Sequence, residues 1–275
     1  MRLWPEAAAA ASVGGSPAER AAAAVTAHCR AVIDGAGAAC VAVKPQLACF
    51  ERLGAPGWAA LAAVAEHARA AGLLVLADAK RGDIDVSAAA YGQALVGTTP
   101  TPFGTVPGLG ADAFTANPYM GRDTLDVLVG AARAVGAGVF VLVRTSNPGA
   151  ADLEDLELAT GGPVWARAAA LVDDLGEAGP RAGLADVGAV VGATAPEHVG
   201  RMRQLMPRAV FLLPGIGAQG GRVEDLAPAF APGRAAGLVT SSRSIVFAHE
   251  ESGAKPAAAA RSVAERLRAA AWALG

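Results

Sequence analysis

The chain has 275 residues, of which 53% are apolar, and its formal net charge is −2. This composition supplies a large hydrophobic core, and the length fits one α/β barrel domain, which typically has about 250 residues. The nearly balanced charge gives no reason to expect a nucleic-acid or membrane-surface partner.

Three cysteines without a C-x-x-C pair argue against a disulfide framework and against a zinc site. The four histidines show no H-x-H or H-E-x-x-H spacing, so no metal site is expected. No uncharged apolar run is long enough to span a membrane, and the alanine run after Glu6 makes a poor signal peptide. We therefore expect a cytoplasmic protein.

The chain begins with a helical pattern. Ser16, Pro17 and Glu19 predict the N-cap, first-turn proline and capping-box glutamate of a helix over residues 20–34. The preceding MRLWPEAAAA carries no strand-like run. Further helices are predicted over residues 57–71, which Gly72 ends, and over 85–96, 122–135, 163–177, 196–206 and 257–274.

Short apolar runs alternate with these helices, at residues 39–43, 73–77, 113–115, 138–143, 187–191, 210–213 and 237–240. They are mostly continuous, which is typical of parallel strands buried on both faces. Residues 98–110, TTPTPFGTVPGLG, are predicted to form a loop rich in proline and glycine.

Repeated βα units predict an α/β fold, either a barrel or an open doubly wound sheet. A TIM (β/α)8 barrel needs eight strands, so in that case the first strand is missing or truncated at the N-terminus. No shift in composition marks a second domain, and we expect a single domain over residues 1–275.

Charged side chains follow two neighbouring strands. LLVLADAKRGDI ends an apolar run in Asp78 and Lys80, which period-two geometry puts on one side, and Gly82 lets the chain turn before Asp83. Lys44 ends the preceding strand, close to Asp78 and Lys80 if the strands are parallel neighbours. Buried charges are costly unless paired or used, and polar residues at this end of a barrel strand are typical of catalysis. A salt-bridged loop is the alternative.

Two further strand ends carry polar groups. LLPGIGAQGG contains Gly215, Gly217, Gly220 and Gly221, whose amides could converge on an anion, and Arg243 follows the next strand. Barrels commonly bind phosphate after their last two strands, where an arginine clamps it bidentately. Ser146 and Asn147 in LVRTSNPGA could read a pyrimidine edge, or could belong to a simple turn.

These segments resemble the orotidine 5′-phosphate decarboxylase family, specifically its bacterial type 2 branch with the A-K-R-G-D-I signature. The matching stretches, in the family's order, are VKPQLACFE, LADAKRGDI, TANPYMG, VLVRTSNPGA, VVGATAP, LPGIGAQGG and SSRSI, spanning Val43 to Ile245. The resemblance implies a cofactor-independent carboxy-lyase that converts orotidine 5′-phosphate to UMP and CO₂, the last step of de novo pyrimidine nucleotide biosynthesis.

The resemblance also implies roles for single residues. Lys80 would protonate C6 of the pyrimidine, Asp78 would lie beside the substrate carboxylate, and Lys44 would hold the network and contact the ribose. A homodimer is implied, in which the partner's site receives Asp83, Ile84 and Ser87. Ser146 would contact the pyrimidine, and Gln219, Arg243 and Gly217 would serve substrate binding, with Gln219 and Arg243 on the phosphate.

The sequence departs from the family pattern at one point, and two other functions are alternatives to this interpretation. The family's first strand normally ends in an aspartate that contacts the ribose, in a G-I-D-P-like segment that is not found here. A Mg²⁺-dependent sugar-phosphate decarboxylase or aldolase shares the D-x-K-x-x-D pattern and predicts an extra carboxylate near Lys44. A catalytically dead nucleotide-binding paralogue predicts UMP binding without turnover.

Overall fold

The computed structural model describes residues 2–10, 14–179 and 183–275. Contacts within the chain define two compact units. The first unit comprises Met1–Ala79 and Ser242–Arg268, and the second comprises Lys80–Ser241 and Ala269–Gly275. One strand, β2 (Leu74–Arg81), passes from the first unit into the second.

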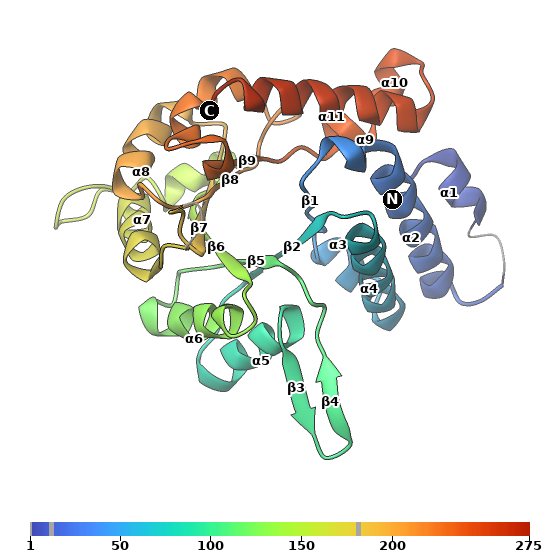
Figure 1. The fold of residues 1–275 in the computed structure, drawn as a ribbon, viewed down its shortest axis with the longest axis horizontal. Coiled ribbons are helices and arrows are strands. Elements are labelled where there is room, and N and C mark those ends of the chain that lie inside the picture. Colours follow the sequence, from blue (N-terminus) through green and yellow to red (C-terminus); the bar gives the residue numbers. More distant parts are fainter. Residues whose placement is uncertain (1, 11–13, 180–182) are drawn as a thin grey trace. The chain divides into compact units, whose positions relative to one another are not determined.

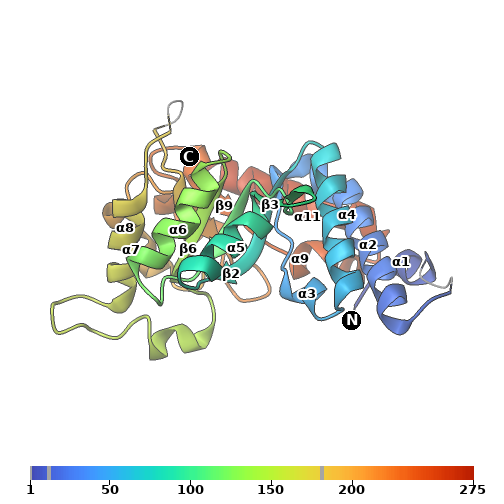
Figure 2. The same ribbon diagram turned by 90° about the horizontal axis from the view of Figure 1, so that it is seen from below.

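The first unit is mainly helical (Figure 1). Its elements are α1 (Pro5–Ala10), α2 (Pro17–Ala36), η1 (Gly37–Ala39), β1 (Ala42–Val43), α3 (Ala48–Glu51), α4 (Ala55–Ala70), α9 (Arg243–Val246), α10 (Ala248–Ser252) and most of α11 (Pro256–Trp272). Helices α2 and α4 lie side by side (Figures 1 and 2). The predicted capping box is confirmed, because Ser16 Oγ accepts from Glu19 N and Glu19 Oε2 accepts from Ser16 N.

The second unit alternates strands and helices. Its elements are α5 (Asp85–Leu95), β3 (Thr98–Thr101), β4 (Gly104–Pro107), β5 (Ala113–Ala116), α6 (Arg122–Arg133), β6 (Gly138–Arg144), η2 (Pro148–Asp152), α7 (Val164–Leu175), β7 (Val187–Val191), η3 (Pro196–His198), α8 (Val199–Leu205), β8 (Phe211–Leu213), η4 (Val223–Phe230), η5 (Arg234–Ala236) and β9 (Gly237–Val239). Every residue of β7 is buried, as the continuous apolar pattern predicted.

Seven strands form one sheet in the order β1-β2-β5-β6-β7-β8-β9. β1 pairs in parallel with β2, and each strand from β5 to β9 pairs in parallel with the next. All seven predicted strands are thus confirmed. Sequential parallel strands joined through helices give the fold of a TIM (β/α)8 barrel without its first strand. Of the N-terminal stretch, residues 2–10 carry α1 and no strand, while Met1 and residues 11–13 lie outside the described residues.

The predicted loop at residues 98–110 is wrong in part, because a β-hairpin occupies most of it. Thr98 pairs with Pro107 and Thr101 with Gly104 in an antiparallel ladder (Figure 1). Proline disfavours strands, but two of the three prolines here, Pro100 and Pro107, lie in the strands of an exposed two-stranded ribbon, where a missing N–H is tolerated. Gly104 has φ +118°, which a turn residue with a side chain rarely adopts.

A buried tryptophan joins the two ends of the chain within the first unit. Trp4 is 1% exposed and packs against Ala36, Ala39, Ala260 and Ala264. Its main-chain N–H donates to His28 Nδ1 at 3.1 Å, and its Nε1–H donates to the carbonyl of Val246 at 2.7 Å. Because Val246 ends α9, the N-terminal segment anchors this short helix.

A buried arginine ties the elements around β8 together in the second unit. Arg203 is 7% exposed, and its guanidinium carbon lies 3.7 Å from the ring centroid of Phe211. Its terminal nitrogens donate over 2.7–3.2 Å to the main-chain carbonyls of Met206, Ala209, Ala229 and Ala236. Burial lowers the pKa of Arg203 to about 10. The glycine-rich segment that follows β8 therefore starts from a firmly held strand.

Candidate active site

A lysine–carboxylate pair lies at the carboxyl ends of β1 and β2. Lys44 Nζ is 2.6 Å from Asp78 Oδ2, and the side chains are 20% and 7% exposed. The register explains the contact, because Val43 pairs with Val75 and Gln46 forms a bridge with Asp78. The predicted proximity of Lys44 and Asp78 is confirmed. A buried carboxylate this close to an ammonium is held in place by charge-assisted hydrogen bonding.

Lys80 marks a break in the regular geometry of β2. Its φ is +47°, in the left-handed region that residues with a side chain seldom enter. Lys80 N donates to Thr115 Oγ1 at 2.8 Å, and the carbonyl of Arg81 accepts from Asn117 N at 2.8 Å. These bonds to the β5 end support the unusual conformation. Asp78 is buried while Lys80 is exposed, and the left-handed φ at Lys80 interrupts the period-two geometry from which both side chains were predicted on one side of the strand.

The turn after β2 is made differently from the prediction. Gly82 is required by a close approach, since a Cβ there would lie 2.9 Å from the carbonyl oxygen of Asn117. A left-handed φ of +41° occurs instead at Asp85, the first residue of α5. Asp83 is half-buried and its Oδ1 accepts from Ile84 N at 2.8 Å. Ile84 and Ser87 are exposed, which suits residues expected to reach a partner subunit.

Ser146 and Gln219 border the same space in the second unit. A Cβ on Gly215 would lie 3.0 Å from Ser146 Cβ and 3.3 Å from Gln219 Oε1. Gly215 has φ +104°, so its backbone favours glycine, and its surroundings leave little space for a side chain. The structure therefore brings together the residues expected to meet the pyrimidine and the phosphate.

The glycine-rich segment after β8 folds back on itself. The amide of Gly217 donates to the carbonyl of Gly221, that of Gly220 to Gly217, and that of Gly221 to Gly215, over 2.8–3.0 Å. In this conformation these three amides do not converge on an anion as the sequence had suggested. Arg243 begins α9 in the first unit and is exposed.

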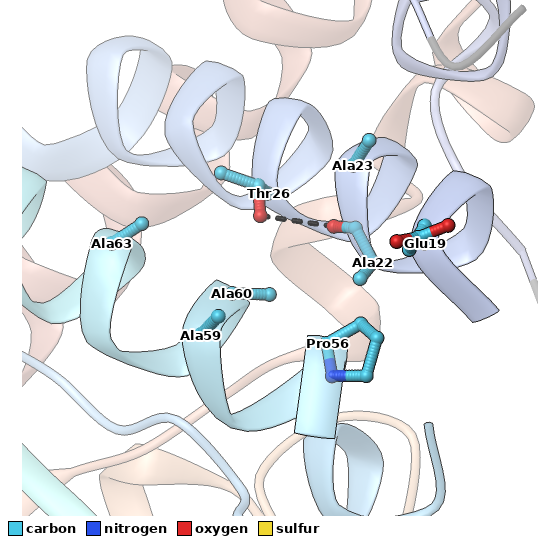
Figure 3. A pocket seen from close by; sticks show the side chains of 8 residues that line it. All are labelled: Glu19, Ala22, Ala23, Thr26, Pro56, Ala59, Ala60 and Ala63. Atoms are coloured by element: carbon cyan, nitrogen blue, oxygen red, sulfur yellow. Dashed lines mark hydrogen bonds between the residues drawn. The ribbon is translucent and has the colours of Figure 1, made fainter. Parts of the chain in front are cut away.

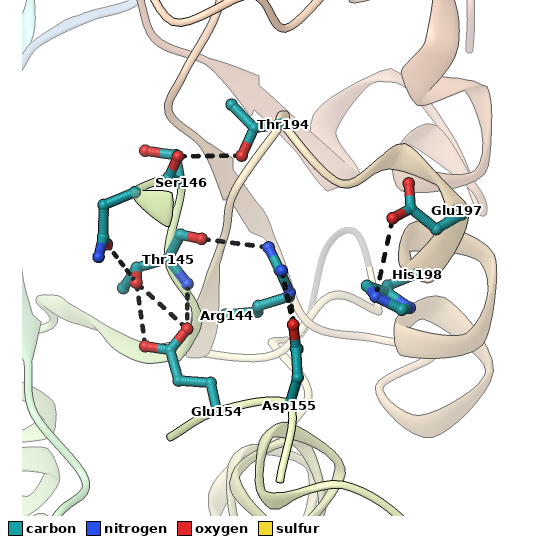
Figure 4. Close-up of polar contacts among 9 residues, drawn as sticks. Arg144, Thr145, Ser146, Glu154, Asp155, Thr194, Glu197 and His198 are labelled. Carbon is teal, nitrogen blue, oxygen red and sulfur yellow. Dashed lines mark hydrogen bonds and ion pairs between the residues drawn. The ribbon is translucent and has the colours of Figure 1, made fainter. Parts of the chain in front are cut away.

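Two carboxylates that the sequence did not single out hold the segment after β6 (Figure 4). Arg144 makes a bidentate contact with Asp155, 2.9 Å from Nε to Oδ1 and 2.8 Å from Nη2 to Oδ2. This guanidinium holds the pKa of Asp155 below its usual range. Thr145 N donates to Glu154 Oε2 at 2.8 Å, and its Oγ1 lies 3.0 and 3.1 Å from the two oxygens of Glu154. The partners lie nine and eleven positions apart in the sequence, and no short motif marks them.

The groove between α2 and α4 carries few polar side chains. A shallow groove between α2 and α4 is lined mainly by alanines, and the hydroxyl of Thr26 there donates to the carbonyl of Ala22 (Figure 3). Among the residues that the structure describes, no group of three or more histidine, cysteine, aspartate or glutamate side chains could hold a metal ion. Within the same residues, no helix combines the length and apolar character needed to span a membrane.

Comparison with known proteins agrees with this geometry. Residues 18–262 match the orotidine 5′-phosphate decarboxylase / HUMPS family. A protein named orotidine 5′-phosphate decarboxylase from Rhodopirellula baltica is 43% identical over 83% of this chain and 75% of its own length. One of the same name from Deinococcus radiodurans is 47% identical over 77% of this chain and 72% of its own.

A solved structure supports the same assignment. The OMP decarboxylase of Leishmania donovani superposes with a TM-score of 0.70 at 33% identity, covering 97% of this chain and 96% of that one. With a family match over most of its length and relatives above 40% identity, this chain belongs to the orotidine 5′-phosphate decarboxylase / HUMPS family.

Proposed function

We propose that this chain decarboxylates orotidine 5′-phosphate to UMP and CO₂ without a cofactor, as the last step of de novo pyrimidine nucleotide biosynthesis. The observation that carries the proposal is the 2.6 Å contact between Lys44 and Asp78 at the carboxyl ends of two neighbouring strands. Lys80 follows Asp78 by two residues on the same strand. The relatives named for this reaction support the choice of substrate.

Lys80 acts as the acid in this proposal. When the bond between C6 and the carboxylate breaks, its electron pair stays on C6 and CO₂ leaves. The Lys80 ammonium stabilises the developing negative charge and then gives C6 a proton, and solvent restores the ammonium. Two unit charges about 4 Å apart, at an effective dielectric of about 20, attract by about 4 kcal/mol. This attraction alone is too small for the whole rate enhancement of a typical enzyme.

Asp78 and Lys44 order the reacting region. The buried Asp78 lies beside the substrate carboxylate, where like-charge repulsion favours loss of CO₂. Lys44 balances the charge of Asp78 and contacts the ribose. The ion pair keeps both groups in place before substrate binds, so that no reorganisation is needed during the reaction.

Binding energy from the rest of the nucleotide supplies the remainder of the rate enhancement. Gln219 and Arg243 bind the phosphate, Gly217 lines that segment, and Ser146 contacts the pyrimidine. The shared border of Ser146 and Gln219 beside Gly215 supports this division of roles. Since the amide of Gly217 is used within its own loop, side chains carry most of the phosphate contact.

The active form is a homodimer with shared sites, to which each subunit contributes Asp83, Ile84 and Ser87 in the partner's site. Large apolar side chains are exposed on segments that follow β2 and β5, namely Ile84 at 56%, Val86 at 84%, Phe103 at 99%, Tyr119 at 82% and Met120 at 43%. Aromatic residues and methionine are enriched in protein–protein interfaces relative to the rest of the surface. The expected setting is the reducing cytoplasm, in keeping with the unpaired cysteines Cys29, Cys40 and Cys49.

The test is the ultraviolet absorbance of orotidine 5′-phosphate mixed with purified protein in EDTA, with the Lys80→Ala variant alongside. Steady loss of substrate absorbance, reduced by at least about a thousandfold in the variant, is expected if Lys80 is the acid. Turnover that appears only after Mg²⁺ is added would favour the metal-dependent sugar-phosphate enzymes. UMP binding without turnover would favour a nucleotide-binding protein that has lost its activity.

A further inference from the structure

The main chain around Ser146 is fixed from several directions. Its carbonyl accepts from Thr194 Oγ1 at 3.0 Å (Figure 4), and the carbonyl of Arg144, two residues earlier, accepts from Gly192 N at 2.7 Å. A Cβ on Gly192 would lie 2.8 Å from both N and Cα of Ser146. The segment that follows neighbouring strand β7 thus bounds the backbone of Ser146 on one side.

Glu154 holds the main chain just before Ser146, through the preceding residue. Its carboxylate accepts from the amide of Thr145 at 2.8 Å and lies within 3.1 Å of the Thr145 hydroxyl, which also lies 2.7 Å from Asn147 Oδ1. Glu154 is thus the acceptor of the main-chain N–H of the residue before Ser146. Asp155 cannot take over this role, because both of its oxygens already accept from Arg144. Figure 4 shows Glu154 and Asp155 serving different residues of the same segment.

We propose that Glu154 is a positioning residue for pyrimidine recognition, acting through Thr145 to aim the hydroxyl of Ser146. The inference rests on the proposed function, in which Ser146 contacts the base. The direction of a serine side chain follows the φ and ψ of its own residue, and the Thr145 amide lies only one peptide unit before the one that joins Thr145 to Ser146. A displacement of about 1 Å in a positioning group can cost about a hundredfold in rate.

Loss of Glu154 removes the acceptor of a half-buried amide. The segment after β6 is then expected to shift, because the amide of Thr145 must find water or another acceptor, while its hydroxyl keeps Asn147 Oδ1 at 2.7 Å. The contact of Ser146 with the base weakens as a result, while the phosphate contacts of Gln219 and Arg243 stay as they were. The effect therefore depends on whether the ligand carries a base.

The experiment compares Glu154→Ala and Glu154→Gln with the wild type in binding of UMP and of ribose 5-phosphate, and in steady-state kinetics. Glu154→Ala is expected to weaken UMP binding and raise KM by about tenfold or more, equivalent to about 1.4 kcal/mol, with a smaller change in kcat. Ribose 5-phosphate, which has no base, binds unchanged. Glu154→Gln restores most of the UMP affinity, because its amide oxygen still accepts from Thr145 N.

The matched control is Glu177→Ala. Glu177 also makes a polar contact within the second unit, 2.9 Å from Arg133 Nη1, but it lies between α7 and β7, at the amino ends of the strands. The Glu177→Ala substitution should leave the binding of both ligands unchanged. Equal losses for UMP and ribose 5-phosphate in Glu154→Ala, no loss for UMP, or no restoration by Glu154→Gln would each overturn the inference. A wild type that neither binds UMP nor turns over substrate would instead count against the proposed function.

Discussion

Lys80 combines the proposed acid role with a backbone conformation that its side chain disfavours. A left-handed residue with a Cβ costs on the order of 1 kcal/mol relative to glycine. The hydrogen bonds from Lys80 N to Thr115 and from Asn117 N to Arg81 offset this cost. Strain of this kind gathers at functional sites, where the position of a reacting group matters more than stability.

Comparing Lys80→Gly with Lys80→Ala isolates the backbone strain. Both variants lose the ammonium and should lose activity together. Only glycine relieves the φ of +47°, so Lys80→Gly should have a free energy of unfolding about 1 kcal/mol above that of Lys80→Ala. Urea denaturation of the two variants measures the difference. Equal stabilities would mean that the strain at Lys80 does not exceed the entropy that glycine adds to the unfolded chain, and would contradict the expected gain.

Sequence patterns identified the charged residues but not how the chain presents them. The proximity of Lys44 and Asp78 follows from parallel strands ending together, which an apolar pattern reveals. The left-handed φ at Lys80 has no signature, because nothing in the residue type favours it. Glu154 also escaped notice, since its partner is set by the path of a loop and not by helical or strand spacing.

At the scale of elements, regular sequence patterns predicted the strands of the sheet correctly, whereas the irregular pattern of residues 98–110 did not predict the hairpin. All seven sheet strands were found, because continuous β-branched and leucine runs distinguish buried strands from the alanine-rich helices. The hairpin of β3 and β4 was missed, because its alternation is weak and its prolines are typical of loops. The expectation of a single domain over residues 1–275 stays a prediction.

The docking of α1 and the residues before it should depend on pH. Trp4 N can donate to His28 Nδ1 only while that nitrogen is unprotonated. Burial lowers the pKa of His28, and the nearby His249 lowers it further. The folded state therefore binds this proton less readily than the unfolded chain. The stabilisation is complete above the unfolded value of about 6.5 and is lost as the pH falls below it towards the folded value.

Unfolding measured between about pH 5.5 and 7.5 tests this expectation. The wild type should lose up to about 1 kcal/mol across that range, since the half-buried ring is partly screened by water. His28→Asn keeps an acceptor for Trp4 N but does not titrate, so its unfolding free energy should fall less. Identical pH profiles for the two proteins would rule out His28 as the source.

At the scale of the whole molecule, the proposed sharing of sites between subunits makes a distinctive prediction. Mixing Lys80→Ala with Asp83→Ala allows heterodimers in which one site carries both changes and the other carries neither. Random exchange of subunits should restore about a quarter of the wild-type activity, because half of the dimers have one intact site. If Asp83 serves its own subunit, every site keeps one defect and the mixture stays inactive.

The hairpin of β3 and β4 forms a ladder of its own, outside the seven-stranded sheet. Its root is tied down by two main-chain bonds, from Gly108 N to the Gly97 carbonyl and from Leu109 N to the Ala94 carbonyl. Opening the ladder above that root exposes almost no additional apolar surface, because its residues are already in water. Its amide protons can therefore exchange with deuterium through local opening. Amide protons of the buried strands exchange only through much larger unfolding events.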